Sequence, residues 1–289
     1  MTAASILPPD SDLYRVLRQA ATERRCVFFA GLPGVGKSLL LQQLAILANE
    51  AGRTASLLQW DVARGPFETP DLLARYPETD GVTHAVIRKA AGLWARGAFV
   101  AWDAQHPAPR SILIGEVPLI GNRLIELVQR QDDASEPLLA GSGTLFLIPV
   151  PSREVRRQIE AARVREMADP AHERERANAV PSLVQALWEE VATVARALGV
   201  KPTDRSAPPI EGFDPDLYAG VYEALLRHRH AARLPVTTVL PVRGSVYDAL
   251  DHAADLVPGP EDVARVMGAV AARPVAEVER EVADWFRLP

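Results

Sequence analysis

Cysteine is almost absent from this chain, because Cys26 is the single example in 289 residues. One cysteine cannot form an internal disulfide, and it excludes any metal site built from several thiolates. Since Cys26 falls inside an apolar run, we interpret it as a small buried side chain rather than a reactive thiol. The six histidines show no metal-ligand spacing, so we expect no metal site made of protein ligands alone.

Long apolar runs, a surplus of positive charge and internal repeats are also missing. No run approaches the roughly 20 residues of a membrane span, and residues 1–9 lack the basic start and apolar core of a secretory signal. The formal net charge of −5 argues against a mainly electrostatic grip on nucleic acid or an anionic membrane. These absences predict a soluble cytoplasmic protein that binds neither, and they leave a homodimer open.

The sequence does contain one complete phosphate-binding motif. Residues Gly31 to Ser38 read Gly-Leu-Pro-Gly-Val-Gly-Lys-Ser, which fits the pattern G-x-x-x-x-G-K-[ST]. An apolar run at 26–30 precedes the motif, and helical apolar spacing follows from Leu39. A chance glycine-rich turn is the alternative, and the order of strand, motif and helix disfavours it.

The motif also predicts how the phosphates of a nucleotide would be held. Backbone N–H groups of such a loop turn inward at a helix N-terminus, where the helix dipole favours an anion. Lys37 is expected to reach the β- and γ-phosphates, and the Ser38 hydroxyl to ligate Mg²⁺. The residues predicted to bind the nucleotide in this loop are Gly31, Gly34, Val35, Gly36, Lys37, Ser38 and Leu39.

Apolar runs typical of buried strands alternate with helical patterns along the chain. This alternation predicts an α/β fold with a mainly parallel five-stranded sheet and helices on both faces. Together with the motif at Gly31 to Ser38, this layout resembles the three-layer fold of P-loop NTPases. The expected strands are 26–30, 54–60, 111–117, 144–149 and 236–242. The expected helices begin near 12, 39, 82, 122, 152, 181 and 214, with further helices at the C-terminus. Within 82–104 a strand at 98–102 is the alternative. We expect one domain over 1–257, with a lid at about 150–180, and a helical extension over 258–289.

Asp61 and Glu116 lie at the ends of predicted strands, where ligands bind in parallel sheets, and Arg123 lies seven residues beyond Glu116. Asp61 is interpreted as a base for a substrate hydroxyl or a ligand of Mg²⁺ through water; the alternative is a carboxylate that caps a turn. Glu116, at the end of an apolar strand, is the candidate acid near the metal; the alternative is an exposed acid at a strand end without a role in the site. Arg123 is assigned to an anionic or hydroxylated acceptor, and an ordinary surface ion pair is the alternative.

The predicted helix after the fourth strand is rich in arginine and glutamate. Arginines that close over a transferring phosphoryl group stabilise its charge, although mixed charge on a helix usually marks a solvated face. We choose Arg163 and Arg165 as catalytic candidates, because they precede the breaker Asp169-Pro170, where a lid could form. The arginines of this segment are Arg153, Arg156, Arg157, Arg163 and Arg165.

Together these landmarks resemble the P-loop kinases that phosphorylate nucleosides, nucleotides and other small metabolites. Ile112-Leu-Ile-Gly-Glu116 with Arg123 resembles the Glu…Arg segment of deoxynucleoside kinases. Arg163-Val-Arg165-Glu166 is similar to their Arg-x-Arg-Glu lid. The stretch 239–245, with Arg243, occupies the place of the loop that contacts adenine, so the resemblance implies a nucleotide-binding role for Arg243. After the second strand, Asp61 to Arg64 looks closer to the Asp-x-x-Arg of adenylylsulfate kinase.

The resemblance implies an ATP-dependent phosphotransferase that uses Mg²⁺, held by Ser38 and Glu116, and transfers the γ-phosphate to a hydroxyl or phosphate of a small molecule. The catalytic residues it implies are Lys37, Asp61, Arg123, Arg163 and Arg165. The alternative is a P-loop ATPase or GTPase switch that acts on a protein partner. Against a GTPase switch, the chain has no guanine-specifying Asn-Lys-x-Asp.

Overall fold

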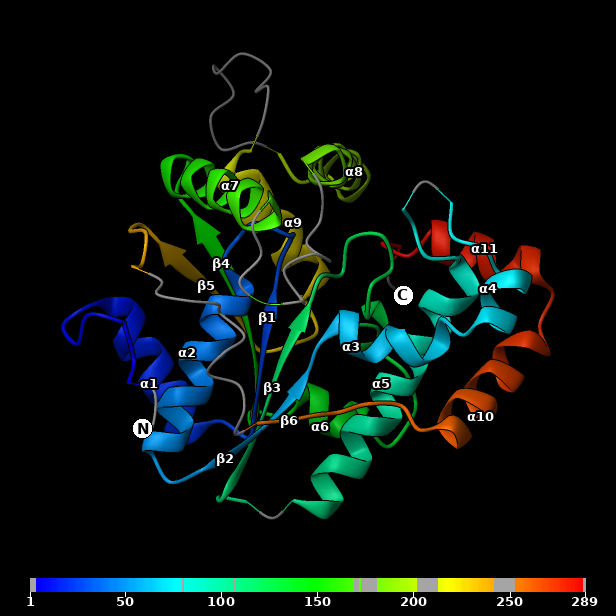
Figure 1. Ribbon diagram of the computed structural model, residues 1–289, viewed down its shortest axis with the longest axis horizontal. Coiled ribbons are helices and arrows are strands. Elements are labelled where there is room, and N and C mark those ends of the chain that lie inside the picture. The colour runs from blue at the N-terminus through cyan, green and yellow to red at the C-terminus, as the bar shows by residue number, and fades with distance from the viewer. Residues whose placement is uncertain are drawn as a thin grey trace.

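A parallel β-sheet forms the centre of the computed structural model, which describes residues 4–79, 81–106, 108–168, 172, 181–201, 213–241 and 253–287. In these residues six strands pair in the order β5-β4-β1-β3-β2-β6, all parallel. Their carboxyl ends therefore meet at one edge, toward which the arrows of Figure 1 point. The strands are β1 (Cys26–Ala30), β2 (Thr54–Leu58), β3 (Ser111–Val117), β4 (Thr144–Pro151), β5 (Ala231–Val236) and β6 (Ala254–Asp255).

The central strand, β1, is buried along its whole length because it has a paired strand on each side and helices on both faces. Successive side chains of a strand point to opposite faces. Accordingly Phe28 packs into one core, where its ring stacks on Phe146 with centroids 5.0 Å apart. Val27 and Phe29 belong to the other core. The two cores make the sheet the middle layer of three.

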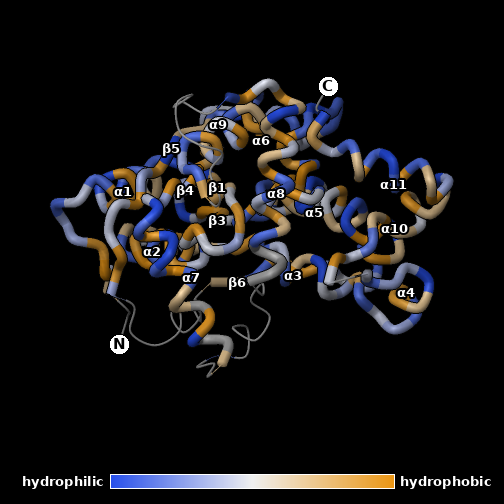
Figure 2. The backbone as a smooth tube through the Cα atoms, turned by 90° about the horizontal axis from the view of Figure 1, so that it is seen from above, coloured by the Kyte–Doolittle hydropathy of each residue, from blue (hydrophilic) through white to orange (hydrophobic). Residues whose placement is uncertain are grey.

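Two helices, α1 (Asp12–Glu23) and α2 (Lys37–Glu50), cover one face of the sheet. The other face is covered chiefly by α5 (Ala85–Gln105), α8 (Pro181–Leu198) and α9 (Pro215–Leu225). The helices α10 (Pro260–Ala271) and α11 (Val275–Ala283) pack on α5 at the far side, as Figure 2 shows. The short elements are α3 (Trp60–Arg64), η1 (Gly65–Phe67), α4 (Pro70–Arg75), η2 (Ile125–Leu127) and α6 (Glu136–Ala140).

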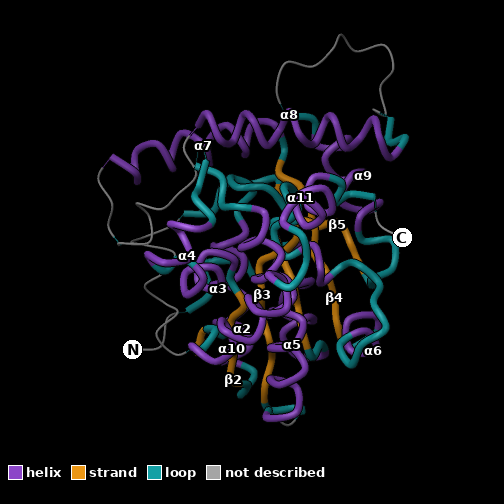
Figure 3. The backbone as a smooth tube through the Cα atoms, turned by 90° about the vertical axis from the view of Figure 1, so that its right-hand side faces the viewer, coloured by secondary structure: helices purple, strands orange, loops and turns teal. Residues whose placement is uncertain are grey.

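The helix α7 (Arg153–Ala168) follows β4 directly and lies, with α8, across the edge where the strands end (Figures 1 and 3). Its inner residues Val155 and Ile159 join the core on the α2 side. The carboxyl edge of the sheet is thus covered by an arginine-rich helix. No helix within the described ranges has the length and apolarity needed to cross a bilayer.

The prediction of a five-stranded sheet is wrong, because the described ranges already contain six paired strands. The fifth strand covers 231–236 rather than 236–242, and β6 was not expected. In β5 only Leu234 and Val236 are buried, so the strand has no continuous apolar run, and Pro235 is tolerated because this is an edge strand. With only two residues, β6 is too short to carry a pattern.

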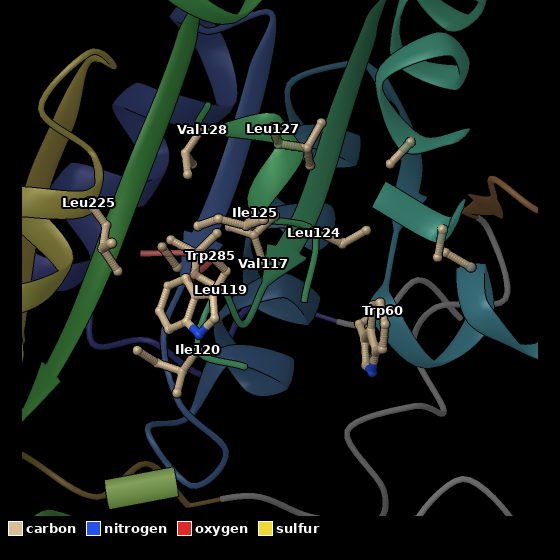
Figure 4. Close-up of a cluster of buried hydrophobic side chains, with 14 of the residues drawn as sticks. Trp60, Val117, Leu119, Ile120, Leu124, Ile125, Leu127, Val128, Leu225 and Trp285 are labelled. Atoms are coloured by element: carbon tan, nitrogen blue, oxygen red, sulfur yellow. The ribbon is translucent and has the colours of Figure 1, made fainter. Parts of the chain in front are cut away.

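The helix predicted from Asn122 to Arg130 is also wrong, since only the short turn η2 forms there. Leu124 has φ 61°, a left-handed conformation that interrupts a right-handed helix over 122–130. Two buried arginines satisfy the carbonyls that a helix would have used: Arg96 donates to Gln129 O at 2.9 Å, and Arg229 to Leu127 O at 3.0 Å. The apolar side chains of the segment fill the core instead, gathered with Trp285 in Figure 4.

Candidate phosphate-transfer site

The loop between β1 and α2 lies at the centre of the sheet's carboxyl edge. Gly34 and Gly36 have φ 81° and 87°, values that glycine adopts without the penalty of a Cβ. Gly36 is also the N-cap of α2 and has no capping side chain, so the first N–H groups of that helix face the loop. A helix N-terminus preceded by such turns is an arrangement that holds anions.

Lys37, in the first turn of α2, folds back over this loop. Its side chain is 7% exposed, and Nζ donates a hydrogen bond to Leu32 O at 3.0 Å. The ammonium group is therefore held inside the loop, beside the glycines. Ser38 and Leu39 are half-buried in the same turn. From this position the Ser38 hydroxyl could reach a metal ion held by phosphates.

Gly31, the first residue of the loop, lies against Tyr218 of α9. A Cβ on Gly31 would lie 2.3 Å from Tyr218 Oη and 2.8 Å from Val35 Cγ2. The hydroxyl of Tyr218 is buried and has no hydrogen-bond partner of good geometry. Burial raises the pKa of Tyr218 well above its ordinary value, so the side chain stays a neutral donor at the base of the loop.

Arg156 of α7 lies close to Tyr218. Its side chain is buried, its Nε lies 2.7 Å from Glu160 Oε1, and its guanidinium covers the ring of Phe213 at 4.4 Å. Nη1 has no hydrogen-bond partner, and the charge of Arg156 acts on the Tyr218 phenol. Ile159, one turn further along α7, would lie 3.8 Å from a Cβ on Gly36. The arginine-rich helix thus covers the phosphate loop directly.

Sequence reasoning did not select Arg156 from the other arginines of this helix. Its pairing with Glu160 at i,i+4 is the pattern of a solvated face, and its burial depends on Phe213, which is distant in the chain. Arg165 is exposed. The side chain of Arg163 and the whole of Arg243 lie outside the described residues.

Asp61 is in the first turn of α3, because β2 ends at Leu58 and not at residue 60. Its carboxylate pairs with Arg64 Nε at 3.1 Å, and its side chain is 59% exposed. Arg64 also pairs with Glu68 of the following turn. Asp61 is therefore accessible from solvent and held in a weak local ion pair.

Arg123 lies within electrostatic range of Asp61. Burial lowers the pKa of Arg123, and the nearby charges of Asp61 and Glu190 oppose that shift. Among the residues that the structure describes, its side chain forms neither a hydrogen bond nor an ion pair within 4.0 Å. A half-buried guanidinium in this state can accept an anionic partner.

Glu116 is the next-to-last residue of β3 and lies in register with Phe29 of β1. The loop is tied to the same strand end, because Gly31 N donates to Val117 O at 3.3 Å. The two candidate metal ligands thus belong to neighbouring parts of the sheet: Glu116 lies at the end of β3, and Ser38 follows the adjacent strand β1. No group of three or more His, Cys, Asp or Glu side chains in the described ranges could hold a metal by itself.

Comparisons with known proteins add no family to this geometry. No protein-family model matches the chain, and no curated protein or solved structure matches it.

Proposed function

We propose that this protein is an ATP-dependent phosphotransferase that transfers the γ-phosphate to a hydroxyl or phosphate group of a small molecule. The proposal is supported most by one arrangement: a lysine and two left-handed glycines in the loop after the central strand, covered by the buried Arg156 and flanked by Asp61 and Arg123. Phosphoryl transfer depends chiefly on positioning and on charge stabilisation, which these groups can supply.

In the proposed reaction ATP with Mg²⁺ supplies the phosphoryl group. The loop N–H groups and Lys37 hold its phosphates, and Ser38 and Glu116 lie where they could hold the metal. Asp61 takes the proton of the acceptor hydroxyl, whose oxygen forms the new bond to phosphorus as the bond to ADP breaks. Arg123 holds the acceptor. Arg156 takes the charge-stabilising role first assigned to Arg163 and Arg165, because its guanidinium lies beside the loop.

Replacing Lys37 tests the donor half of the site. We expect Lys37→Ala to bind Mg·ATP roughly 10- to 150-fold more weakly, corresponding to about 1.5–3 kcal/mol for a hydrogen bond to a charged group. Isothermal titration calorimetry would measure the change. Lys201→Ala is the matched control, because Lys201 is exposed and outside the loop. Unchanged affinity in Lys37→Ala would contradict the proposal.

The acceptor half is tested by measuring ADP release in the presence of nucleosides, nucleotides, sugars and other hydroxyl compounds. A phosphotransferase is expected to release ADP faster with its acceptor and to yield one phosphorylated product per ADP. If no compound raised turnover above basal hydrolysis and a protein partner did, the switch interpretation would replace this one.

A further inference from the structure

The segment from Pro118 to Leu124, directly after β3, has an unusual backbone. Leu119, Asn122 and Leu124 have φ values of 62°, 56° and 61°, although none of them is glycine. A left-handed leucine costs about 1–2 kcal/mol, whereas asparagine adopts this conformation more readily. Such conformations persist where surrounding contacts enforce them, and they concentrate at functional sites.

The surroundings do enforce this shape. Leu119 N donates to Arg123 O at 3.0 Å and Arg123 N to Leu119 O at 3.2 Å, which closes the segment on itself. Arg88 of α5 donates to Gly121 O, and Tyr222 of α9 donates to Pro118 O at 2.6 Å. The segment is therefore a rigid platform and not a loose connection.

Two polar side chains on this platform have no hydrogen-bond or ion-pair partner among the residues that the structure describes. The carboxamide of Asn122 is 1% exposed, and both its oxygen and its nitrogen lack hydrogen bonds. The neighbouring Arg123 forms no hydrogen bond or ion pair with the described residues through its side chain. Unsatisfied buried groups cost free energy unless something outside the protein pairs with them.

Two guanidinium groups near the platform, those of Arg88 and Arg123, form no ion pair within 4.0 Å with the residues that the structure describes. Arg64 is paired with Asp61 and Glu68, Glu126 is paired with Lys89, and the carboxylate of Glu190 accepts a hydrogen bond from Trp285 Nε1 at 3.0 Å. Glu190 is the remaining carboxylate beside the two arginines: a Cβ on Gly121 would lie 3.6 Å from Glu190 Oε2 and 3.9 Å from Arg88 Nη1. Burial and the charge of Arg123 lower the pKa of Arg88, the effect of two cations placed close together.

We propose that Arg123, Arg88 and Asn122 bind an anionic group on the acceptor, so that the acceptor is an anionic small molecule rather than a neutral alcohol. An anion with several oxygens, such as a phosphate, sulfate or carboxylate, can take N–H donors from two guanidinium groups and an amide at once. The platform lies at the end of β3, next to the strand that carries the phosphate loop. The conclusion that the acceptor is anionic rests on the proposed phosphotransferase function. The existence of an anion-binding site at Arg123, Arg88 and Asn122 does not depend on that function.

Inorganic phosphate is the probe for this site. The phosphate loop is first filled with Mg²⁺ and a non-hydrolysable ATP analogue, and phosphate is then titrated by calorimetry. We expect the wild type to bind phosphate under these conditions and Arg123→Gln to bind it roughly 10- to 100-fold more weakly. Arg15→Gln is the matched control, because Arg15 is an exposed arginine of α1. Equal binding by wild type and Arg123→Gln, or no binding by the wild type, would overturn the proposal.

Two further measurements keep the result interpretable. Arg123→Lys keeps the positive charge but lacks the planar guanidinium. We expect its affinity for phosphate to lie between those of the wild type and Arg123→Gln. This variant tests the site if Arg123→Gln does not fold. If no nucleotide binds, the same titration is made without nucleotide on Lys37→Ala. Binding of phosphate that Arg123→Gln weakens in that background would support the anion site while the phosphotransferase proposal fails.

Comparing neutral compounds with their anionic counterparts as acceptors identifies the class of anion that the site binds. ADP release is compared for glycerol, glycerol 3-phosphate and glycerate, and for ribose and ribose 5-phosphate. We expect the anionic members to accelerate release and the neutral members to leave it unchanged, with the ranking of phosphate against carboxylate identifying the group. Acceleration by the neutral compounds alone would count against an anionic acceptor.

Discussion

Replacing Lys89 with methionine is expected to destabilise the folded protein by about 3–5 kcal/mol near neutral pH, because the change leaves a buried carboxylate without its cation. Lys89 Nζ lies 3.2 Å from Glu126 Oε1 and 2.5 Å from Glu281 Oε1. The side chains of Lys89 and Glu126 are 5% and 0% exposed. Glu281 is partly exposed and can be solvated when Lys89 is removed, but Glu126 cannot. Urea unfolding would measure the loss, with Lys201→Met as the exposed control.

The loss is expected to depend on pH with a definite sign. Burial raises the pKa of Glu126, and the charge of Lys89 opposes that shift. In Lys89→Met the opposition is gone, so the folded-state pKa of Glu126 lies further above its unfolded value. A carboxyl with a raised folded pKa contributes its stability at low pH and loses it as pH rises through that pKa. The difference in free energy of unfolding between the wild type and Lys89→Met should therefore become smaller at acidic pH and larger toward neutral pH.

A double variant separates this explanation from simple loss of packing. Lys89→Met with Glu126→Gln removes both charges, and we expect it to recover a large part of the stability and most of the pH dependence. If the double variant is as unstable as Lys89→Met at every pH, the uncompensated carboxylate is not the cause. The cluster matters to the site because Glu126 follows Arg123 by three residues and because Lys89 joins α5 to α11.

The sequence predicts those elements whose pattern is continuous. The strands 26–30 and 111–117 and the helix 181–198 are confirmed residue for residue, because each strand is a short, mainly apolar run and the helix is a full amphipathic repeat. The helix α5 is confirmed within a few residues, and the alternative of a strand at 98–102 is wrong. The α/β layout with helices on both faces of a parallel sheet follows from the alternation of these elements.

The parts that could not be predicted are those determined by distant residues. The shape of 118–130 depends on Arg96 and Arg229, which are separated from it by about 30 and 100 residues in the chain, and local propensity favoured a helix there. Arg156 is buried because Phe213 lies under its guanidinium, a contact that no spacing rule indicates. Asp61 lies in a helical turn and not at the predicted strand end, because Trp60 starts α3 and its side chain joins the core.

Adding a single methyl group at Gly31 is expected to lower the affinity for Mg·ATP by roughly 10²-fold, more than most single changes at the loop. The new Cβ would lie 2.3 Å from Tyr218 Oη and 2.8 Å from Val35 Cγ2, so the loop must move relative to α9. Overpacking of this kind costs about 1–3 kcal/mol of stability. A displaced loop also misplaces the lysine and the N–H groups together, and the loss of one or two hydrogen bonds to charged phosphates, at about 1.5–3 kcal/mol each, corresponds to roughly two orders of magnitude in affinity. Calorimetric titration with Mg·ATP and thermal unfolding would measure the two effects.

The clash with Tyr218 makes this expectation specific. Tyr218→Phe removes the nearest oxygen and leaves the ring in place, so Gly31→Ala combined with Tyr218→Phe should regain part of both stability and affinity. The contact with Val35 remains, and recovery should therefore be incomplete. Gly97→Ala is the matched control: Gly97 is a helical glycine with nothing within 4 Å of an added Cβ, and its replacement should leave affinity unchanged. If the double variant binds no better than Gly31→Ala, the tyrosine does not set the position of the loop, and the packing of α9 against it has another role.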